Sequence, residues 1–392
     1  MRAFVASCFL SLICGAFSGV VHGQTPGRQA GDGGSEARLV LSEAVADTAF
    51  PGAVAVAGRG GEVLMTVAAG RYGIDDSRPV VDSTVYDLAS VTKVVSMTTA
   101  IMLLVADGVL EIDGYVGSYL PRFGGGWKDS VTVRHLLTHT SGLPSWRPLY
   151  LEATDRREAI DSLYSTQLDT IPGVRYRYSD LGAITLGLVV ESIVGRPLDE
   201  IMLKRVWRRL GMTSTGYVPD AHLLDHVAPT ELDPVRGRII RGEVHDENCW
   251  RLGGVSGHAG LFSNAPDLAV FAQWMLDLYH GRVLADHPLY VPREIVAEFT
   301  RRQDGPEGST RALGWDTPSD SLSTAGTLMS RVSFGHTGFT GTSIWIDPAN
   351  DLFVILLTNR VHPTRRSYKI GRVRGLLADA IVSELLSSED PR

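Results

Sequence analysis

The chain has 392 residues, of which 44% are hydrophobic and 21% charged, and its formal net charge is −7. This length is enough for one large domain or two ordinary domains with a filled core. The composition excludes a repetitive or wholly disordered chain. The arginines are scattered and form no basic tract, so we expect no nucleic-acid partner.

The first residues indicate a secretory signal. Arg2 gives a positive start, residues 4–21 are apolar without a charge, and Val21-His22-Gly23 offers a cleavage site before Gln24. We therefore expect residues 1–23 to be a signal peptide and the mature protein to be secreted or periplasmic, with an uncleaved membrane anchor as the alternative. No later segment is long and apolar enough to predict a membrane span after cleavage.

Cysteine usage is compatible with that location. Cys8 and Cys14 fall within the signal, so the mature chain keeps only Cys249 and cannot form an internal disulfide. A buried, inert thiol is the usual state of such a cysteine.

The next segments predict a leader, a helix and a hairpin. Residues 24–36 are rich in glycine and polar side chains and predict a flexible leader. Residues 38–47 have helical spacing. Residues 53–57 and 62–68 predict two strands joined by a glycine-rich turn. Residues 90–107 are apolar nearly all round, which predicts a buried helix that ends at Gly108.

The remaining elements predict the architecture. Helices are expected at 181–194, 198–210 and 266–279, strands at 331–335, 342–346 and 352–358, and a closing helix at 367–386. Strands at both chain ends and helices between them predict an α+β fold, with an antiparallel sheet flanked by helices and an inserted, mainly helical domain. We expect one hydrolase domain over 37–392, its sheet part at about 37–90 and 250–392 and its helical part at about 100–245.

Ser90 and Lys93 begin the predicted buried helix three residues apart, so their side chains share one face. A serine hydroxyl needs a group to take its proton before it becomes a good nucleophile. Burial and the helix N-terminus are both expected to lower the pKa of Lys93 and so make it a base. The chain has only four lysines, and arginine could not lose a proton here. The alternative is a serine cap followed by a surface lysine.

Two further motifs carry polar groups suited to a cleft. Tyr178-Ser179-Asp180 follows the Pro172-Gly173 turn and leads into an apolar helix, where a tyrosine can act as a general base. A half-buried tyrosine with a local hydrogen bond is the alternative. His336-Thr337-Gly338 ends a predicted strand, and the N–H of Phe339 is a candidate for an oxyanion hole with the N–H of Ser90. An ordinary strand end with a structural histidine is the alternative.

Taken together, these three motifs resemble the class C β-lactamase and penicillin-binding serine hydrolase family. The order Ser-x-x-Lys, Tyr-Ser-Asp, His-Thr-Gly is similar to that family, as are Leu136-Leu137-Thr138-His139-Thr140-Ser141-Gly142 and Gly257-His258-Ala259-Gly260. The likeness runs from about Ala37 to the C-terminal helix. It implies an acyl-enzyme on Ser90, a proton shuttle through Lys93 and Tyr178, and a β-lactamase/transpeptidase-like fold.

Two residues depart from the pattern of the resembled β-lactamases. His336 stands where lysine is usual, so a charge that titrates near neutral pH replaces a permanent one. Asp180 stands where asparagine is usual, and an ionised carboxylate cannot donate to a substrate amide carbonyl. The expected substrate-binding residues are Asp180, His336, Thr337, Gly338 and Phe339, and both departures argue against efficient β-lactam hydrolysis.

No metal or other cofactor is expected, because the histidines match no zinc spacing and the serine mechanism needs none. The leading hypothesis is a carboxypeptidase-like penicillin-binding enzyme acting on cell-wall-type D-amino-acid peptides or β-lactams. A carboxylesterase with the same acyl-enzyme is the second hypothesis. The third, of another class, is an inactive protein that binds peptidoglycan fragments.

Overall fold

A computed structural model describes residues 34–387, and the statements below concern this part of the chain. The predicted signal peptide, 1–23, and most of the predicted leader, 24–36, lie outside the described residues. The first helix, α1, spans Ser35–Ala46, so the last two residues assigned to the leader are helical.

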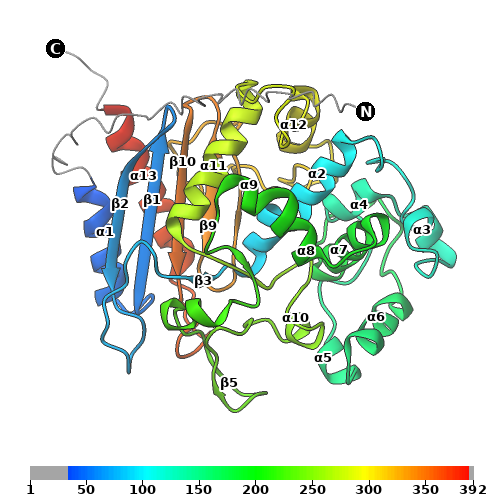
Figure 1. Ribbon diagram of the computed structural model, residues 1–392, viewed down its shortest axis with the longest axis horizontal. Coiled ribbons are helices and arrows are strands. Elements are labelled where there is room, and N and C mark those ends of the chain that lie inside the picture. Colours follow the sequence, from blue (N-terminus) through cyan, green and yellow to red (C-terminus); the bar gives the residue numbers. More distant parts are fainter. Residues whose placement is uncertain (1–33, 388–392) are drawn as a thin grey trace, which may run out of the picture. The chain divides into compact units, whose positions relative to one another are not determined.

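A five-stranded antiparallel sheet in the order β2-β1-β10-β9-β8 unites the two ends of the chain (Figure 1). Its strands are β1 (Gly52–Arg59), β2 (Glu62–Gly70), β8 (Phe334–Thr337), β9 (Ser343–Asp347) and β10 (Leu352–Thr358). Strand β1 pairs directly with β10, with Ala53 opposite Thr358. This arrangement confirms the predicted α+β fold with a sheet built from both chain ends.

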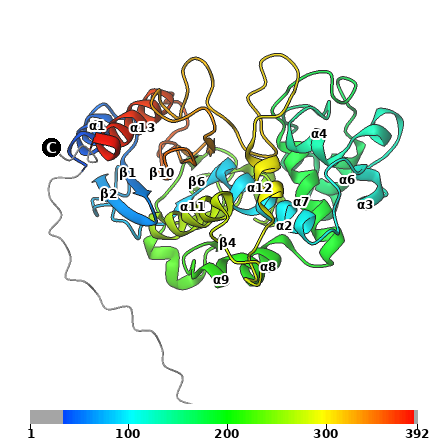
Figure 2. The ribbon, with the colours of Figure 1, turned by 90° about the horizontal axis from the view of Figure 1, so that it is seen from above.

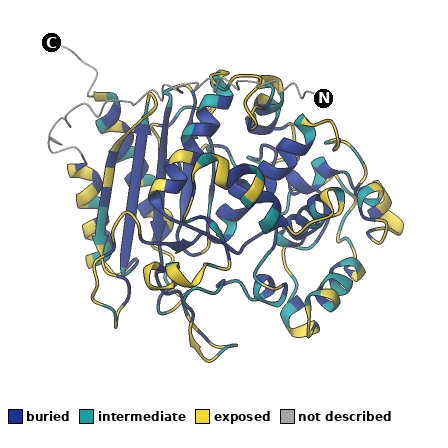
Figure 3. Cartoon of the chain, viewed as in Figure 1, coloured by how far each residue is buried: buried dark blue, intermediate teal, exposed yellow. Residues whose placement is uncertain are grey.

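Helices cover both faces of this sheet (Figure 2). Helices α1 and α13 (Ile370–Ser387) lie on one face, and α11 (Ala265–His280) lies on the other. Alternate side chains of β1 follow the same division. Ala53 and Ala55 pack with α1 and α13, whereas Val54 and Val56 join the main core with α11. Strands β1 and β10 are therefore buried along most of their length (Figure 3).

The remaining helices lie beside the sheet (Figure 1). They are α2 (Thr99–Ala106), α3 (Val116–Tyr119), α4 (Val133–Leu137), α5 (Leu149–Glu152), α6 (Arg156–Ser165), α7 (Asp180–Val194), α8 (Leu198–Met202), α9 (Arg208–Leu210), α10 (Glu247–Arg251) and α12 (Arg293–Thr300).

Short strands in this region were not predicted. Strands β3 (Tyr86–Asp87), β7 (Leu261–Ser263) and β4 (Gly216–Tyr217) form a three-stranded sheet, and β5 (Leu232–Asp233) pairs with β6 (Arg238–Ile239). Strands of two or three residues are too short to show a period of two in the sequence.

The segment predicted as one regular helix over 90–107 has three parts. It begins with a 3₁₀ turn at Ala89–Val91, continues as a π-helical turn at Lys93–Thr98 and ends as α2 before Gly108, whose φ is +71°. It is buried as expected. Local π-helical geometry often accompanies functional sites, because it reorients side chains within a helix.

The expectation that no segment after the signal is long and apolar enough to span a membrane is wrong. Among the described residues, Ala89–Ala106 is long and apolar enough to cross a membrane by length and composition alone. A second stretch qualifies only if α7 and residues 198–210 are joined across a 69° bend. The first stretch is 83% buried inside the protein, as in a core helix.

The strand predicted at 331–335 lies three residues later, as β8. Ser330 donates both its N–H and its hydroxyl to the Asp347 carboxylate, at 2.8 and 2.5 Å, and the N–H of Ser333 closes a turn on the carbonyl of Ser330. Because these bonds hold residues 330–333 in a turn, pairing with β9 starts only at Phe334.

Candidate active site

Ser90 begins the buried core segment directly after a strained residue. Ala89 has φ +45°, a conformation that residues other than glycine rarely adopt. Its N–H donates to the buried Asp87 carboxylate at 2.8 Å, which also accepts the N–H of His245 at 2.7 Å. These bonds hold the backbone in place and present Ser90 at the start of the helix.

Lys93 reaches back to Ser90 from the next turn. Its side chain is 1% exposed, and its amine donates to three oxygens: Ser90 Oγ at 2.9 Å, Asp180 Oδ1 at 2.7 Å and the carbonyl of His258 at 3.0 Å. An ammonium group has three hydrogens to donate, so every one of them has an acceptor.

The expected lowering of the Lys93 pKa is wrong. Burial acts in that direction, but the charges of Asp180 and Tyr178 outweigh it and raise the pKa of Lys93 above its usual value. Lys93 therefore rests as an ammonium at neutral pH. Sequence reasoning missed this because Asp180 lies 87 residues from Lys93.

Tyr178 contacts the same serine from the other side. Its hydroxyl donates to Ser90 Oγ at 2.9 Å, and its ring packs on His139 with centroids 4.5 Å apart. Burial raises the pKa of Tyr178, although Lys93 opposes the change, so the phenol is protonated at neutral pH. Ser179 caps α7 through its hydroxyl, and Asp180 follows as the first residue of the helix. The structure thus brings together Ser90, Lys93 and Tyr178.

His336 also faces this group, with its ring centroid 6.1 Å from that of Tyr178. Its Nδ1 lies 2.8 Å from the carbonyl of Thr337, which places a proton on Nδ1, and the buried Nε2 has no partner within residues 34–387. Burial, reinforced by the charges of Arg311 and Lys93, lowers the pKa of His336 well below its usual value. The expectation that His336 titrates near neutral pH is therefore wrong.

Gly338 allows the end of β8 to approach the segment that carries Ser90. A Cβ at this position would lie 2.1 Å from Thr342 Oγ1 and 2.4 Å from the carbonyl oxygen of Leu88. Thr342 donates its hydroxyl to that same carbonyl at 2.9 Å, and Thr340 donates to the carbonyl of Asp87 at 2.7 Å. These contacts fix the strand end against the segment that carries Ser90.

Phe339 projects from this strand end and is 46% exposed. Its carbonyl accepts a hydrogen bond from Arg360 Nε at 2.7 Å, whereas its N–H has no acceptor among the described residues. An unpartnered backbone donor beside a nucleophile is suited to a developing oxyanion.

Two cavities meet at Ser90, Tyr178 and Phe339. One, of about 360 Å³, is lined by Ser90, Tyr178, Arg311, His336, Thr337, Gly338, Phe339, Arg360, Ile370 and Arg374. The other, of about 330 Å³, is lined by Ala89, Ser90, Trp146, Tyr150, Tyr178, Asp180, His245, Asp246, Glu247, His258, Ala259, Phe339 and Arg365. We call them the arginine pocket and the aromatic pocket.

Two buried arginines of the arginine pocket were missed from the sequence. Arg311 Nη1 and Arg374 Nε have no partner among the described residues. Burial, together with the charge of Arg360, lowers the pKa of Arg374 to about 9, which leaves it charged at neutral pH. Burial opposes the charge of Arg311, but Asp316 and two tyrosines outweigh it and raise the pKa of Arg311. Arg374 could have been noticed as a charge on the apolar stripe of α13; Arg311 gave no signal.

Two of the histidines near the site pair with carboxylates. His245 Nε2 lies 2.9 Å from Glu231, and His258 Nε2 lies 2.8 Å from Asp246. No group of three or more His, Cys, Asp or Glu side chains in residues 34–387 has the arrangement of a metal site. The sequence-based expectation of a metal-free mechanism stays a prediction.

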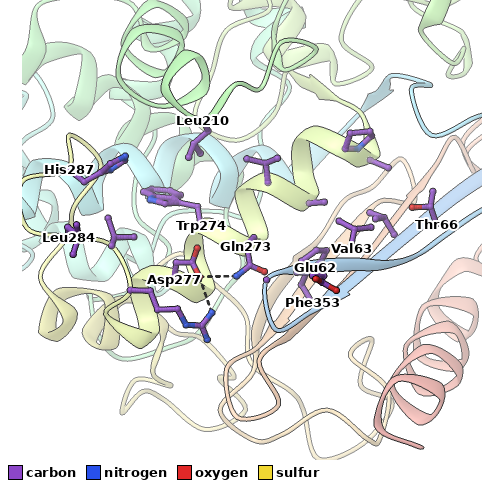
Figure 4. Close-up of a pocket in the computed structure, with 18 of the residues that line it drawn as sticks. Glu62, Val63, Thr66, Leu210, Gln273, Trp274, Asp277, Leu284, His287 and Phe353 are labelled. Atoms are coloured by element: carbon purple, nitrogen blue, oxygen red, sulfur yellow. Dashed lines mark hydrogen bonds and ion pairs between the residues drawn. The ribbon is translucent and has the colours of Figure 1, made fainter. Parts of the chain in front are cut away.

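A larger cavity, of about 980 Å³, lies between α11, the β1–β2 hairpin and residues 282–288 (Figure 4). Its walls are mainly apolar, and Asp277 is already bonded to Gln273 at 2.9 Å and to Arg282 at 3.0 Å. It contains none of the predicted catalytic residues. The chemistry-bearing groups thus converge at Ser90 rather than here.

Comparison with known proteins agrees with this geometry. The family model described as Beta-lactamase matches residues 37–378. The chain belongs to the β-lactamase family. This is a family of serine hydrolases, and the fold and family expected from the sequence motifs are confirmed.

Curated relatives in this family carry the name D-alanyl-D-alanine carboxypeptidase. One from Escherichia coli K12 is 35% identical over 309 residues, which cover 71% of this chain and 70% of the relative. One from Salmonella typhi is 34% identical over 331 residues, covering 76% and 75%.

Solved structures show the same fold. A class C β-lactamase from Rhodobacter sphaeroides superposes with a TM-score of 0.68 at 23% identity, covering 90% of this chain and 99% of the other. EstCE1, a hydrolase with promiscuous acyltransferase activity, gives a TM-score of 0.71 at 23% identity, covering 89% and 98%.

The close approach at Gly338 can be tested by Gly338→Ala. Because the added methyl group meets backbone and a bonded hydroxyl, we expect a loss of about 1–3 kcal/mol in the free energy of unfolding, measured by denaturant titration. We also expect slower acylation of Ser90, because the strand end must move. Gly371→Ala is the control, since its Cβ meets nothing within 4 Å. Equal stability of both variants would contradict the proposed packing.

Proposed function

We propose that this protein is a secreted serine carboxypeptidase that forms an acyl-enzyme on Ser90 and releases the C-terminal residue of D-amino-acid peptides. The observation that carries the proposal is the set of three arginines, Arg311, Arg360 and Arg374, that line a pocket which also contains Ser90. Their positive charge favours a substrate carboxylate in this pocket. The names of the curated relatives point to the same substrate class.

The reaction follows from the placement of the groups. The substrate carboxylate lies in the arginine pocket, and the acyl part of the peptide lies in the aromatic pocket. Ser90 Oγ attacks the peptide carbonyl, and the N–H groups of Ser90 and Phe339 stabilise the oxyanion. After the Tyr178–Lys93 pair has released one proton to solvent, it accepts the proton of Ser90 and passes it to the leaving amine as the C–N bond breaks. Water then cleaves the acyl ester and restores the serine hydroxyl.

An esterase is the second candidate, and Asp180 favours it. The Asp180 carboxylate accepts a hydrogen bond from Lys93 and cannot donate one to a substrate amide carbonyl. An ester substrate needs fewer contacts to amide groups, so the absence of a hydrogen-bond donor on the side chain of Asp180 weakens its binding less than that of a peptide.

The deciding experiment combines covalent trapping with substrate turnover. The mature protein is incubated with a fluorescent penicillin, and its intact mass is followed over time beside release of D-alanine from a D-Ala-D-Ala peptide. We expect a stable adduct on Ser90, D-alanine release, and loss of both in Ser90→Ala. Rapid penicillin turnover would point to a β-lactamase, and hydrolysis of p-nitrophenyl esters alone to an esterase. Loss of all covalent chemistry would contradict the proposal.

The role of Lys93 is tested by Lys93→Arg. A guanidinium keeps the positive charge but cannot release a proton, so we expect acylation to fall by about 10²–10⁴-fold with little change in thermal stability. Lys204→Arg is the matched control, because Lys204 is 56% exposed and pairs with Glu200 on the surface. Near-normal acylation in Lys93→Arg, measured by stopped-flow with an activated ester, would contradict a proton-transfer role.

The carboxylate-binding role of the arginine pocket is tested by Arg311→Ala. Loss of a charged hydrogen-bond donor costs about 1.5–3 kcal/mol, which corresponds to about a 10- to 100-fold rise in KM for a peptide with a free C-terminus. KM for the matching C-terminal amide should change little. Because His336 is neutral and the arginines stay charged, KM of the wild-type enzyme should also be flat from about pH 6 to about pH 8. Equal effects on acid and amide would overturn the assignment.

A further inference from the structure

We propose that Asp180 acts as the counter-ion of Lys93 rather than as a substrate contact, and that it keeps the resting enzyme in a protonated form which becomes reactive only as the pH rises. The inference rests on the proposed acyl-enzyme on Ser90. The proposal assigns Asp180 a positioning role toward Lys93. An asparagine at position 180 would lack this role because its side chain carries no charge.

The geometry of the ion pair supports this role. Asp180 Oδ1 lies 2.7 Å from Lys93 Nζ, which is the shortest of the three contacts of that amine. The lysine side chain is 1% exposed and that of Asp180 is 21% exposed, so little water screens the pair. Asp180 is also the first residue of the 15-residue helix α7, where the helix dipole favours a negative charge. The carboxylate is therefore directed at the amine, in a position where both the helix dipole and the ammonium group favour a negative charge.

Within residues 34–387, no carboxylate other than that of Asp180 contacts Lys93. The neighbouring His258 contributes its backbone carbonyl, while its ring is bonded to Asp246 at 2.8 Å. Other titratable and charged groups face Lys93 from the packed elements. They are Tyr178 beside α7, His139 after α4, His336 on β8, and Cys249 on α10. Asp180 makes the largest of the contributions that favour the charged form of Lys93.

A protonated resting state has a direct consequence for Ser90. Its oxygen accepts hydrogen bonds from both Lys93 and Tyr178, and neither donor has a free site for the serine proton while both remain protonated. One proton must leave the Lys93–Tyr178 pair before Ser90 can transfer its own. The negative charge of Asp180 opposes that loss from either partner, since it raises the pKa of both. The acylation rate should therefore rise toward alkaline pH.

Asp180→Asn removes the charge and keeps the shape. We expect the rise of kcat/KM with pH to move to lower pH, so that the ratio of the rate at about pH 6 to the rate at about pH 9 increases about tenfold or more. Asp180→Glu, which keeps the charge, should retain the wild-type pH profile even if its rate falls. An activated ester that lacks amide groups serves as substrate, which removes any effect of amide recognition. If Asp180 only contacts substrate, Asp180→Asn will leave the pH profile unchanged, and this outcome would overturn the proposal.

A second measurement does not depend on activity. The chain contains only four lysines, so NMR of isotope-labelled lysine side chains can follow each amine, with Lys93 assigned by its absence in Lys93→Arg. The exposed Lys204 and Lys369 serve as internal references. We expect Lys93 to lose its proton at lower pH in Asp180→Asn than in the wild type. Identical titration of both proteins would overturn the counter-ion role, whereas failure of Ser90 to form an acyl-enzyme would affect only the proposed function.

Discussion

The site depends on one buried cation. The Lys93 amine is almost completely removed from water, yet each of its three hydrogens meets an oxygen, from Ser90, Asp180 and the carbonyl of His258. Burying an ammonium without such partners would be strongly unfavourable, so these acceptors must be in place for the core to form around it. These three acceptors come from separate segments of the chain. The hydrogen bonds that allow Lys93 to be buried therefore also bring Ser90 and its neighbours together.

The sheet supplies the second half of the site through short, specific contacts. Thr340 and Thr342 donate to the carbonyls of Asp87 and Leu88, and Gly338 leaves room for this approach. Arg374 adds a further tie by donating to the carbonyls of Gly338 and Thr342, at 2.6 and 2.8 Å. The end of β8 and the start of the core helix therefore form one rigid unit, which fixes the Phe339 N–H relative to Ser90.

Local sequence patterns predicted much of the fold and of the candidate site. The features that were not predicted depend on contacts between residues that are distant in the sequence. The spacing of Ser90 and Lys93 lies within one helical turn, and the motif around Tyr178 was recognisable by resemblance. The predicted direction of the pKa shift of Lys93 was wrong because the shift depends on Asp180, which is distant in the sequence and contacts Lys93 only in the fold. His336 was expected to titrate near neutral pH. Its pKa is lowered by burial and by the nearby charge of Arg311, and both the burial and this proximity arise only when the protein folds. Strand β8 begins three residues later than predicted because Ser330 is hydrogen-bonded to the Asp347 carboxylate. The spacing of apolar residues does not reveal this contact.

The charges around Ser90 give the cleft a direction. The arginine pocket contains Arg311, Arg360 and Arg374, whereas the aromatic pocket contains Asp180, Asp246 and Glu247 together with Arg365. These carboxylates pair with Lys93, His258 and Arg365, so an anionic group is attracted mainly to the arginine pocket. Under the proposed function, a peptide binds with its C-terminus among the arginines and its acyl part beside Trp146 and Tyr150. This proposed orientation places the last peptide bond at Ser90 and makes the terminal residue, rather than the longer part of the chain, the leaving group.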